Sequence, residues 1–462
     1  MLGRYYGRLL NWLPALEGAY FLGVTHAAVA IRLGTNPGTI EHSVGAVWPD
    51  AIVFAGVVLL ALTAAGLYNP RLRDGPEGIA VRVVLAGAIA TALLSALYYA
   101  APHLYLGRGI LLLALLLSFG GVGAVRWGLH RLSREEHRKR RVLVLGAGKR
   151  AGILARLRRR TDLIGLRLVG YVRYPGDALS VPEAQLVELD QPLSEWVGTH
   201  GIDELVVAPD ERRQNLDMHE LLLCRGRGQL ISDLPTFYER ETGRVSLDVL
   251  LPSWLAFSGG FQSTYVGERL KRLFDVVVSG SLMILASPTM LAAALAIWLE
   301  AGGRGPILYR QVRVGANERE FSVYKFRSMR TDAEKDGRAR WASENDPRIT
   351  RVGAILRRFR IDELPQIFNV LRGEMSFVGP RPERPEFVHR LEQSFPRYAD
   401  RHRVKPGLTG WAQISYPYGA SERDAFEKLQ YDLYYVKNHS VYLDLTILLQ
   451  TAEVVLWGKG AR

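Results

Sequence analysis

Two adjacent carboxylates, Asp362 and Glu363, follow a run of arginines that ends at Arg360. Because Pro365 is tolerated in a first helical turn, we expect a helix to begin here with Asp362 as its N-cap. Nearby cations such as Arg357 would hold Asp362 ionised. An ionised carboxylate beside guanidinium groups could attack a phosphoryl group. As a simple N-cap, Asp362 would instead contribute about 1 kcal/mol to the helix.

Basic residues around this pair are suited to binding phosphate. Phosphoryl transfer depends mainly on positioning and on neutralising charge. Arg381 stands between two prolines, which would present its guanidinium as a rigid bidentate fork; the alternative is a turn residue in a polyproline-like loop. Glu363 could hold Mg²⁺, which prefers oxygen ligands. The residues expected to bind substrate phosphates here are Lys325, Arg327, Arg357, Arg360 and Arg381.

An apolar stretch at 274–299 precedes these residues and is long enough to cross a bilayer. Both of its flanks are basic, which argues against crossing. Ser287 and Pro288 lie near its middle, and a proline there removes a backbone hydrogen bond and bends the helix. We therefore predict a re-entrant helix at about 270–300 that breaks at Ser287-Pro288, with the Ser287 hydroxyl bonding the carbonyl near Ile284. A kinked helix that crosses fully is the alternative.

Four further apolar stretches lie in the first 130 residues, at 15–33, 47–67, 79–100 and 109–127. Each approaches the roughly 20 residues needed to span a bilayer. Their arginines Arg32, Arg82 and Arg126 lie near span ends, where we expect them to snorkel. Arg71 and Arg73 occupy one loop, and the following loop has no Lys or Arg. This alternation places both ends of the bundle in the cytoplasm.

The middle of the chain predicts a Rossmann-like α/β domain. Strand candidates lie at 141–145, 166–173 and 204–208, with helices to about Arg160 and at 215–227. Gly146 and Gly148 begin a G-x-G-x-x-A turn after the first strand, which is the setting of a possible nucleotide loop. However, no acidic residue ends the second strand, where an NAD site needs one. The alternative is that the glycines serve only the turn.

The composition limits which kinds of site and partner molecule the protein can have. The 462 residues carry a formal charge of +13 and a single cysteine. An intramolecular disulfide and a cysteine-based zinc site are therefore excluded. The positive charge calls for an anionic partner: nucleic acid, anionic lipid or a phosphorylated substrate.

Several stretches, in this order, resemble the bacterial sugar transferase family, the monotopic phosphoglycosyl transferases that act on polyprenyl phosphate. The resemblance covers about 265–462, and the chain as a whole looks like the large subclass that starts exopolysaccharide or O-antigen repeat units. The matching stretches are KR-x-FD at 271–275, Ser287-Pro288, KFRSMR at 325–330, DELPQ-x-x-NVL-x-GEMS-x-VGPRPE at 362–383, KPGLTGWAQI at 405–414, YDLYYVKN at 431–438, LDL at 443–445 and the closing GKGA at 458–461.

The resemblance implies a reaction. A sugar-1-phosphate passes from a UDP-sugar to undecaprenyl phosphate, releasing UMP. By position, Asp362 is the nucleophile that forms a phosphosugar–enzyme intermediate, and Glu363 is the partner of Mg²⁺. Lys325, Arg357 and Arg381 correspond to family positions, and Asp432 matches a family acid that we group with the substrate-binding residues.

The predicted fold is a membrane α-helical bundle plus α/β: four transmembrane helices in 1–130, a Rossmann-like domain in 131–262, and a mostly α-helical catalytic domain in 263–462. We expect a multi-pass protein of the bacterial inner membrane with its catalytic domain on the cytoplasmic face. The expected partners are undecaprenyl phosphate, a UDP-sugar and membrane lipids, with no nucleic acid. The middle domain offers a surface for a homodimer, and the helix at 441–457 could anchor at the interface or pack on the domain.

Two other functions compete. A membrane-bound nucleotide-sugar dehydratase or epimerase commonly needs a Tyr-x-x-x-Lys pair, and no lysine of this chain has a tyrosine four residues before it. A non-catalytic membrane regulator that binds nucleic acid would carry its charge on an isolated patch. Here the basic residues of the last third lie beside carboxylates and prolines instead.

Overall fold

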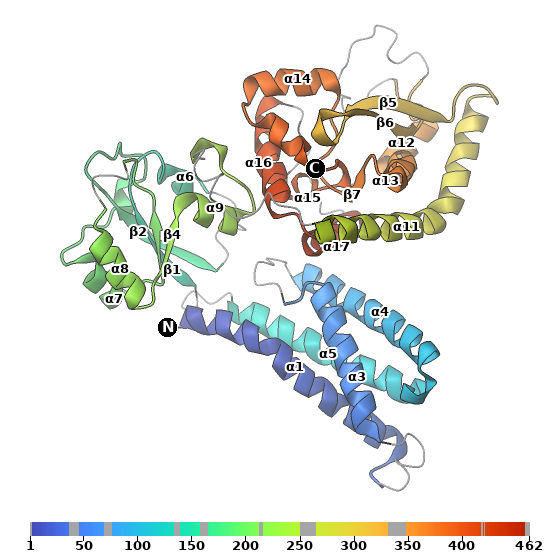
Figure 1. The fold of residues 1–462 in the computed structure, drawn as a ribbon, viewed down its shortest axis with the longest axis horizontal. Helices are drawn as coiled ribbons and strands as arrows, with labels where there is room; N and C mark the ends of the chain where they lie inside the picture. The colour runs from blue at the N-terminus through green and yellow to red at the C-terminus, as the bar shows by residue number, and fades with distance from the viewer. Residues whose placement is uncertain are drawn as a thin grey trace. The chain divides into compact units, whose positions relative to one another are not determined.

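The computed structural model describes residues 2–36, 46–68, 76–133, 139–157, 165–211, 216–249, 265–330, 348–416, 419 and 421–457. The chain divides into two compact units, 1–250 and 251–462 (Figure 1). The first unit contains a helical bundle and a parallel sheet. The domain boundary predicted at 262 falls in 251–264, outside the described residues.

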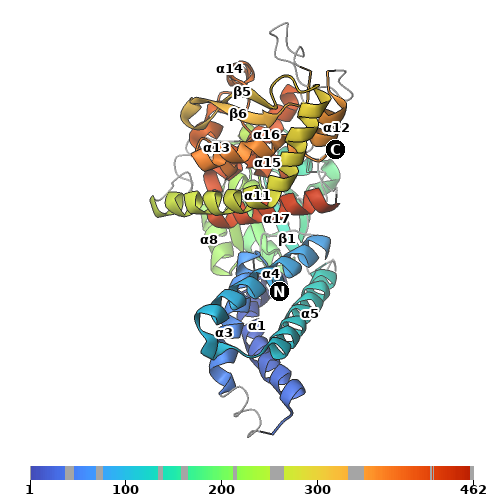
Figure 2. The same ribbon diagram turned by 90° about the vertical axis from the view of Figure 1, so that its right-hand side faces the viewer.

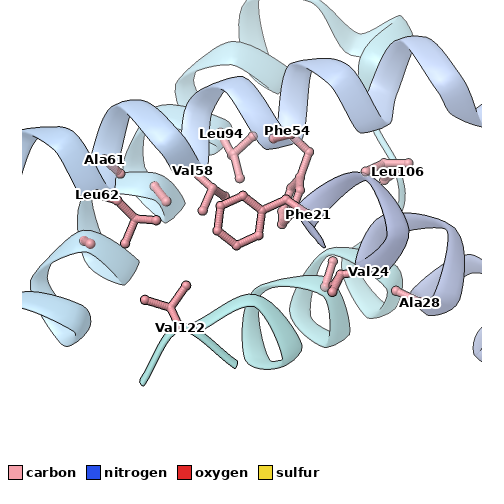
Figure 3. Close-up of a cluster of buried hydrophobic side chains, with 14 of the residues drawn as sticks. Phe21, Val24, Ala28, Phe54, Val58, Ala61, Leu62, Leu94, Leu106 and Val122 are labelled. Atoms are coloured by element: carbon pink, nitrogen blue, oxygen red, sulfur yellow. The ribbon is translucent and has the colours of Figure 1, made fainter. Parts of the chain in front are cut away.

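The bundle consists of long helices that share one apolar core (Figure 3). The first helix packs on the second and fourth, and the third also packs on both. Phe21, Phe54, Leu94 and Val122 bring one large side chain from each helix into this core. The helices are α1 (Leu2–Leu33), α3 (Val47–Ala64), α4 (Pro76–Ala100) and α5 (Arg108–Ser133), with the short η1 (Pro102–Leu104) before α5.

Two arginines of the bundle do not snorkel as expected. Arg82 is only 1% exposed and donates to the Ala65 carbonyl at 3.0 Å. Arg126 pairs with Glu17 of α1 at 3.1 Å. Each guanidinium thus has an acceptor inside the bundle, in the turn after α3 for Arg82 and on α1 for Arg126.

Among the described residues, four helices are long and apolar enough to cross a membrane: Val47–Ala64, Gly78–Ala100, Arg108–Gly128 and Tyr265–Glu300. The first three match predicted spans. The first predicted span is helical within α1, but α1 is not among these four, and Glu17 and Arg32 lie within the span. Its crossing stays a prediction. The loop arginines Arg71 and Arg73 lie outside the described residues.

The first unit also holds a four-stranded parallel sheet of order β2-β1-β3-β4. Apolar side chains pack on both faces, around Val144 on one and Leu143 on the other. All three predicted strands are confirmed, whereas the predicted first helix is reduced to a four-residue helix in the described part. The elements are β1 (Arg140–Leu145), α6 (Gly152–Ala155), β2 (Leu166–Val172), η4 (Glu183–Gln185), α7 (Leu193–Thr199), β3 (Glu204–Val207), α8 (Met218–Gly226), β4 (Leu230–Asp233), α9 (Leu234–Thr242) and η5 (Leu247–Val249).

The second unit combines helices with two small sheets, an antiparallel hairpin and a parallel pair. The strands were not predicted. Its elements are α11 (Tyr265–Glu300), β5 (Leu308–Val314), η6 (Ala316–Glu318), β6 (Glu320–Phe326), α12 (Arg351–Arg358), η7 (Ile361–Gln366), α13 (Ile367–Arg372), β7 (Ser376–Val378), α14 (Pro385–Ser394), η8 (Tyr398–Arg403), β8 (Gly407–Thr409), α15 (Trp411–Ser415), α16 (Glu422–Asn438) and α17 (Val441–Trp457).

Helix α11 is continuous through Pro288 and bends sharply (Figures 1 and 2). The Ser287 hydroxyl donates to the Ile284 carbonyl at 2.8 Å, as predicted. Beyond the bend, Ala293 and Ile297 pack on Phe326 and Leu356. Both halves of the helix are therefore held against the second unit, while its large apolar residues such as Leu285 and Leu291 stay exposed.

Polar contacts fix the first half of α11. Asp275 accepts from the Ser376 hydroxyl and the Phe377 amide, both at 2.9 Å. Lys271 pairs with buried Asp444 of α17 at 2.5 Å. Arg272 donates to the carbonyls of residues 370 and 371, at the end of α13, each at 2.6 Å. The KR-x-FD sequence thus positions this helix, and α17 packs against it.

Candidate active site

The centre of the site is the carboxylate of Glu363. Lys325 on β6 donates to Glu363 Oε1 at 3.0 Å, and Arg381, in the loop after β7, donates to the same oxygen at 2.7 Å. Burial alone would raise the pKa of Glu363, but Arg381 and Lys325 together lower it well below its usual range. Burial in turn lowers the pKa of Lys325. The hairpin, η7 and the Arg381 loop therefore meet at one ionised carboxylate.

Asp362 is 8% exposed and lies in the first turn of η7. The expected N-cap role is wrong, because Arg360 occupies that position and no side chain caps the turn. The expected effect of the cations is also wrong in its net direction. Burial and the charge of Glu363 raise the pKa of Asp362 and outweigh Lys325, Arg357 and Arg360, which lower it.

The remaining predicted arginines lie at different places. Arg357 ends α12, and Arg360 takes a left-handed backbone conformation with φ 57° just before the carboxylate pair. Such a conformation is unfavourable for a residue other than glycine and is often found at functional sites. Arg327 directly follows β6, and its guanidinium lies beside Gly305, with Nη1 only 2.6 Å from where a Cβ on that glycine would be. We therefore find Lys325, Asp362, Glu363 and Arg381 together, with Arg357 and Arg360 beside them.

Asp432 does not face these groups directly. It is 3% exposed and pairs with Arg401, which the sequence did not single out, at 2.8 Å. Arg401 also donates to the Arg381 carbonyl at 2.9 Å. Arg313 donates to the next carbonyl, that of Pro382, at 2.9 Å. The loop that carries the Arg381 guanidinium is thus fixed by two other arginines.

Glycines allow this loop to pack closely. A Cβ on Gly379 would lie 2.3 Å from the Lys405 carbonyl oxygen, and one on Gly407 would lie 2.0 Å from the Gly379 nitrogen. The Gly407 amide donates to the Pro380 carbonyl at 2.9 Å. The KPGLTG stretch therefore supports the GPRPE stretch through the backbone, because no side chain fits between them.

Parts of the chain are similar to known proteins. Residues 266–458 match the family model for the bacterial sugar transferase. A UDP-N-acetylgalactosamine-undecaprenyl-phosphate N-acetylgalactosaminephosphotransferase from Aeromonas hydrophila is 41% identical over 237 residues, covering 50% of this chain and 55% of that protein. A UDP-glucose:undecaprenyl-phosphate glucose-1-phosphate transferase from Xanthomonas campestris pv. campestris is 34% identical over 334 residues, covering 70% of this chain and 67% of that protein.

The chain belongs to the bacterial sugar transferase family. An undecaprenyl-phosphate glucose phosphotransferase from Komagataeibacter xylinus is also similar, at 44% identity over 196 residues, 41% of this chain and 36% of that protein. The matched part of this chain thus covers about half of the Aeromonas relative (55%) and about a third of the Komagataeibacter relative (36%). Lys325, Asp362, Glu363 and Arg381 all lie within the region that matches the family model.

Glu363 is suited to holding Mg²⁺. Within the described residues, both hydrogen bonds to its carboxylate go to Oε1, which leaves Oε2 for a hard cation. Two cations already face this carboxylate, so a bare Mg²⁺ would meet positive charge. A magnesium ion that arrives bound to a diphosphate brings negative charge with it. Glu363 could then bind the metal ion, while Lys325 and Arg381 face the negative charge of the phosphates.

The glycine turn of the middle sheet is filled by the chain itself. Asp210, which follows β3, accepts from the amides of Lys149 and Arg150, both at 3.0 Å. A Cβ on Gly148 would lie 2.1 Å from Asp210 Oδ2, and one on Gly146 would lie 2.5 Å from the Ala208 backbone. The amides that would bind a nucleotide phosphate already bind a carboxylate, so the geometry favours the turn-only interpretation of both glycines.

Proposed function

We propose that this chain transfers a sugar-1-phosphate from a UDP-sugar to undecaprenyl phosphate, giving undecaprenyl-diphosphate-sugar and UMP. The observation that carries the proposal is the adjacent pair Asp362 and Glu363, whose pKa values are displaced in opposite directions. Paired carboxylates displaced in this way take different roles in catalysis. The three relatives described above are all named as transferases to undecaprenyl phosphate, which supports this acceptor.

Asp362 is the nucleophile in this proposal. Its carboxylate oxygen attacks the phosphorus that carries the sugar, the bond from that phosphorus to the bridging oxygen breaks, and UMP leaves with that oxygen. The raised pKa of Asp362 makes the ionised carboxylate a stronger nucleophile than an ordinary aspartate. An oxygen of undecaprenyl phosphate then attacks the same phosphorus and releases Asp362 unchanged.

The surrounding cations bind the phosphates and stabilise the charge of the transition state. Arg381 and Lys325 contact Glu363 on one side, and Arg357 and Arg360 lie close enough to Asp362 to affect its pKa. Fixed guanidinium groups in a buried site stabilise developing phosphoryl charge without reorganising. Mg²⁺ held by Glu363 would supply further neutralisation of the diphosphate.

The membrane location follows from where the two substrates are found. The acceptor is a lipid, and the nucleotide donor is soluble, so the site has to lie at the bilayer surface. A re-entrant α11, with its exposed apolar residues in lipid, would hold the second unit there on the cytoplasmic face of the inner membrane. This reaction would be the first membrane step in exopolysaccharide or O-antigen synthesis. The names of the relatives include both N-acetylgalactosamine and glucose, so the donor has to be found by assay.

The test is UMP release by the full chain from a panel of UDP-sugars with undecaprenyl phosphate. The wild type should release UMP with one sugar, and intact mass after mixing with that donor alone should show a phosphosugar adduct. Asp362→Asn should lose both, while Asp400→Asn, whose carboxylate pairs with Arg397 and Arg403 rather than with the carboxylate pair or its cations, should keep both. Full activity of folded Asp362→Asn would exclude the covalent mechanism, and no turnover with any UDP-sugar would overturn the proposed function.

A further inference from the structure

A second cluster of metal-binding side chains lies in the second unit, separate from the carboxylate pair. Glu318 in the β5–β6 turn, Glu392 on α14 and His402 in η8 bring ligand atoms within 4.8 Å of one another. These residues are far apart in sequence, and the fold brings η6 and η8 into contact. The proximity of the three therefore depends on the tertiary structure.

Two polar atoms of this cluster are buried without a partner. His402 is 7% exposed, and its Nδ1 has no hydrogen-bond partner in the described part of the chain. Oε1 of Glu392 is likewise buried and unpaired there. Leaving a buried polar atom unsatisfied is unfavourable, and native structures contain few such atoms. His402 Nδ1 and Glu392 Oε1 belong to one group of potential ligands, and both lack a partner. This indicates a bound species that contacts both atoms.

The charges point to a cation. Glu318 and Glu392 are like charges, and burial and the charge of Glu318 raise the pKa of Glu392 against the opposing effect of His389. Burial and the neighbouring Arg401 lower the pKa of His402 to about 3. The unpaired Nδ1 of His402 could supply a lone pair to a cation placed between the carboxylates.

We propose that Glu318, Glu392 and His402 bind one divalent transition-metal ion of the Zn²⁺ type. One imidazole and two carboxylates are ligands that Zn²⁺ accepts, whereas an oxygen-only set would favour Mg²⁺ or Ca²⁺. Zinc bonds of about 2.0–2.2 Å place tetrahedral ligand atoms roughly 3.4 Å apart. Glu318 is exposed on its turn and can close the remaining distance.

The ion would connect the hairpin turn to α14 and η8. His402 follows Arg401, the residue that holds the Arg381 carbonyl. A metal at this place would stabilise the segment that fixes the Arg381 loop, without contacting substrate. Its role is structural, so its loss should affect thermal stability more than the chemical step.

The experiment uses the full chain in detergent, stripped with a chelator and titrated with Zn²⁺ by calorimetry. Stoichiometry is checked by elemental analysis, and Co²⁺ is used as a spectroscopic probe of the ligand geometry. Wild type should bind one equivalent that raises its thermal midpoint. Glu318→Gln, at an exposed position, should weaken this binding at least about tenfold, equivalent to about 1.4 kcal/mol, and so should Glu392→Gln. Because His402 is buried, its variants could fail to fold, and the two glutamate variants keep the test decisive.

Glu386→Gln, an exposed acid on the same helix, is the matched control and should bind as wild type does. Glu363→Gln separates this ion from any metal at the carboxylate pair and should leave the Zn²⁺ equivalent in place. Equal binding by wild type, Glu318→Gln and Glu392→Gln would overturn the proposal, as would loss of the equivalent in Glu363→Gln alone. Absence of Zn²⁺ binding by folded wild type would also overturn it.

Discussion

Arg401 Nη2 lies 2.8 Å from Asp432 Oδ2 and 2.9 Å from the carbonyl oxygen of Arg381. Arg401 and Asp432 are both almost fully buried. Asp432 neutralises and orients Arg401, and Arg401 donates to the backbone of Arg381, whose side chain contacts Glu363. A chain of contacts therefore connects Asp432 to the carboxylate pair. In this structure Asp432 contacts Arg401, so its geometry favours a positioning role, and the predicted substrate-binding role stays a prediction.

This relationship predicts that Asp432→Asn leaves the buried Arg401 charge uncompensated. We expect a loss of about 3–5 kcal/mol in the free energy of unfolding, measured by denaturation of the purified full chain, together with loss of UMP release. The double variant Arg401→Met/Asp432→Leu should regain most of the stability, because apolar replacement of a whole buried pair is often neutral. It should stay inactive, because the Arg381 carbonyl has lost its donor. A stable and fully active double variant would contradict the positioning role.

The pH dependence of the proposed reaction should report on Asp362. Since burial and Glu363 raise its pKa, and since the nucleophile has to be ionised, the rate should fall with decreasing pH at a higher pH than for an ordinary aspartate, whose pKa is about 3.9. Lys325 lowers the pKa of Asp362, so Lys325→Gln should move this acid limb to still higher pH and reduce kcat. The exposed Lys405→Gln is the control and should leave the limb in place. If Lys325→Gln left the acidic side of the pH–rate profile unchanged, that side would report the ionisation of a group other than Asp362.

Some of these relationships could be predicted from sequence and others could not. The strands β1–β3 and the Ser287–Ile284 hydrogen bond were predictable because apolar runs, glycine turns and a mid-helix proline act locally. The Arg401–Asp432 pair could not be predicted, because nothing in the local sequence distinguishes Arg401 from its neighbours Arg397 and Arg403.

Three features of the second unit were predicted incorrectly or missed because they depend on the tertiary structure or on a weak local pattern. A carboxylate near a proline resembles an N-cap, but the left-handed Arg360 takes that position and lets Asp362 turn inward. The sign of the shift at Asp362 depends on burial, which the spacing of arginines does not reveal. The β5–β6 hairpin was missed because charged residues, Arg310 and Arg313 in β5 and Glu320 and Lys325 in β6, interrupt the apolar pattern of its strands.

The middle sheet should bind no dinucleotide, because Asp210 already accepts from the Lys149 and Arg150 amides. Calorimetry of the full chain with NAD⁺ should show no binding. Asp210→Ala should reduce the free energy of unfolding by about 1–3 kcal/mol, since two amides lose their acceptor, and should leave UMP release unchanged. Asp190→Ala, at an exposed position, is the control and should not alter stability. NAD⁺ binding that Gly148→Ala abolishes would show that the turn is a functional nucleotide site.

The re-entrant arrangement of α11 can be tested by labelling both of its flanks. In a Cys224→Ser background, Arg269→Cys and Arg304→Cys should both react with a membrane-impermeant maleimide from the cytoplasmic side, in inside-out vesicles. His103→Cys, between α4 and α5, should react only from the opposite side and serves as the control. The expectation rests on Pro288, which cannot donate to the Ile284 carbonyl, and on Ser287, which satisfies that carbonyl at 2.8 Å and so makes the bend tolerable in lipid. Labelling of Arg269→Cys and Arg304→Cys from opposite sides would mean that α11 crosses the membrane, and the second unit would then lie where no UDP-sugar is available to it.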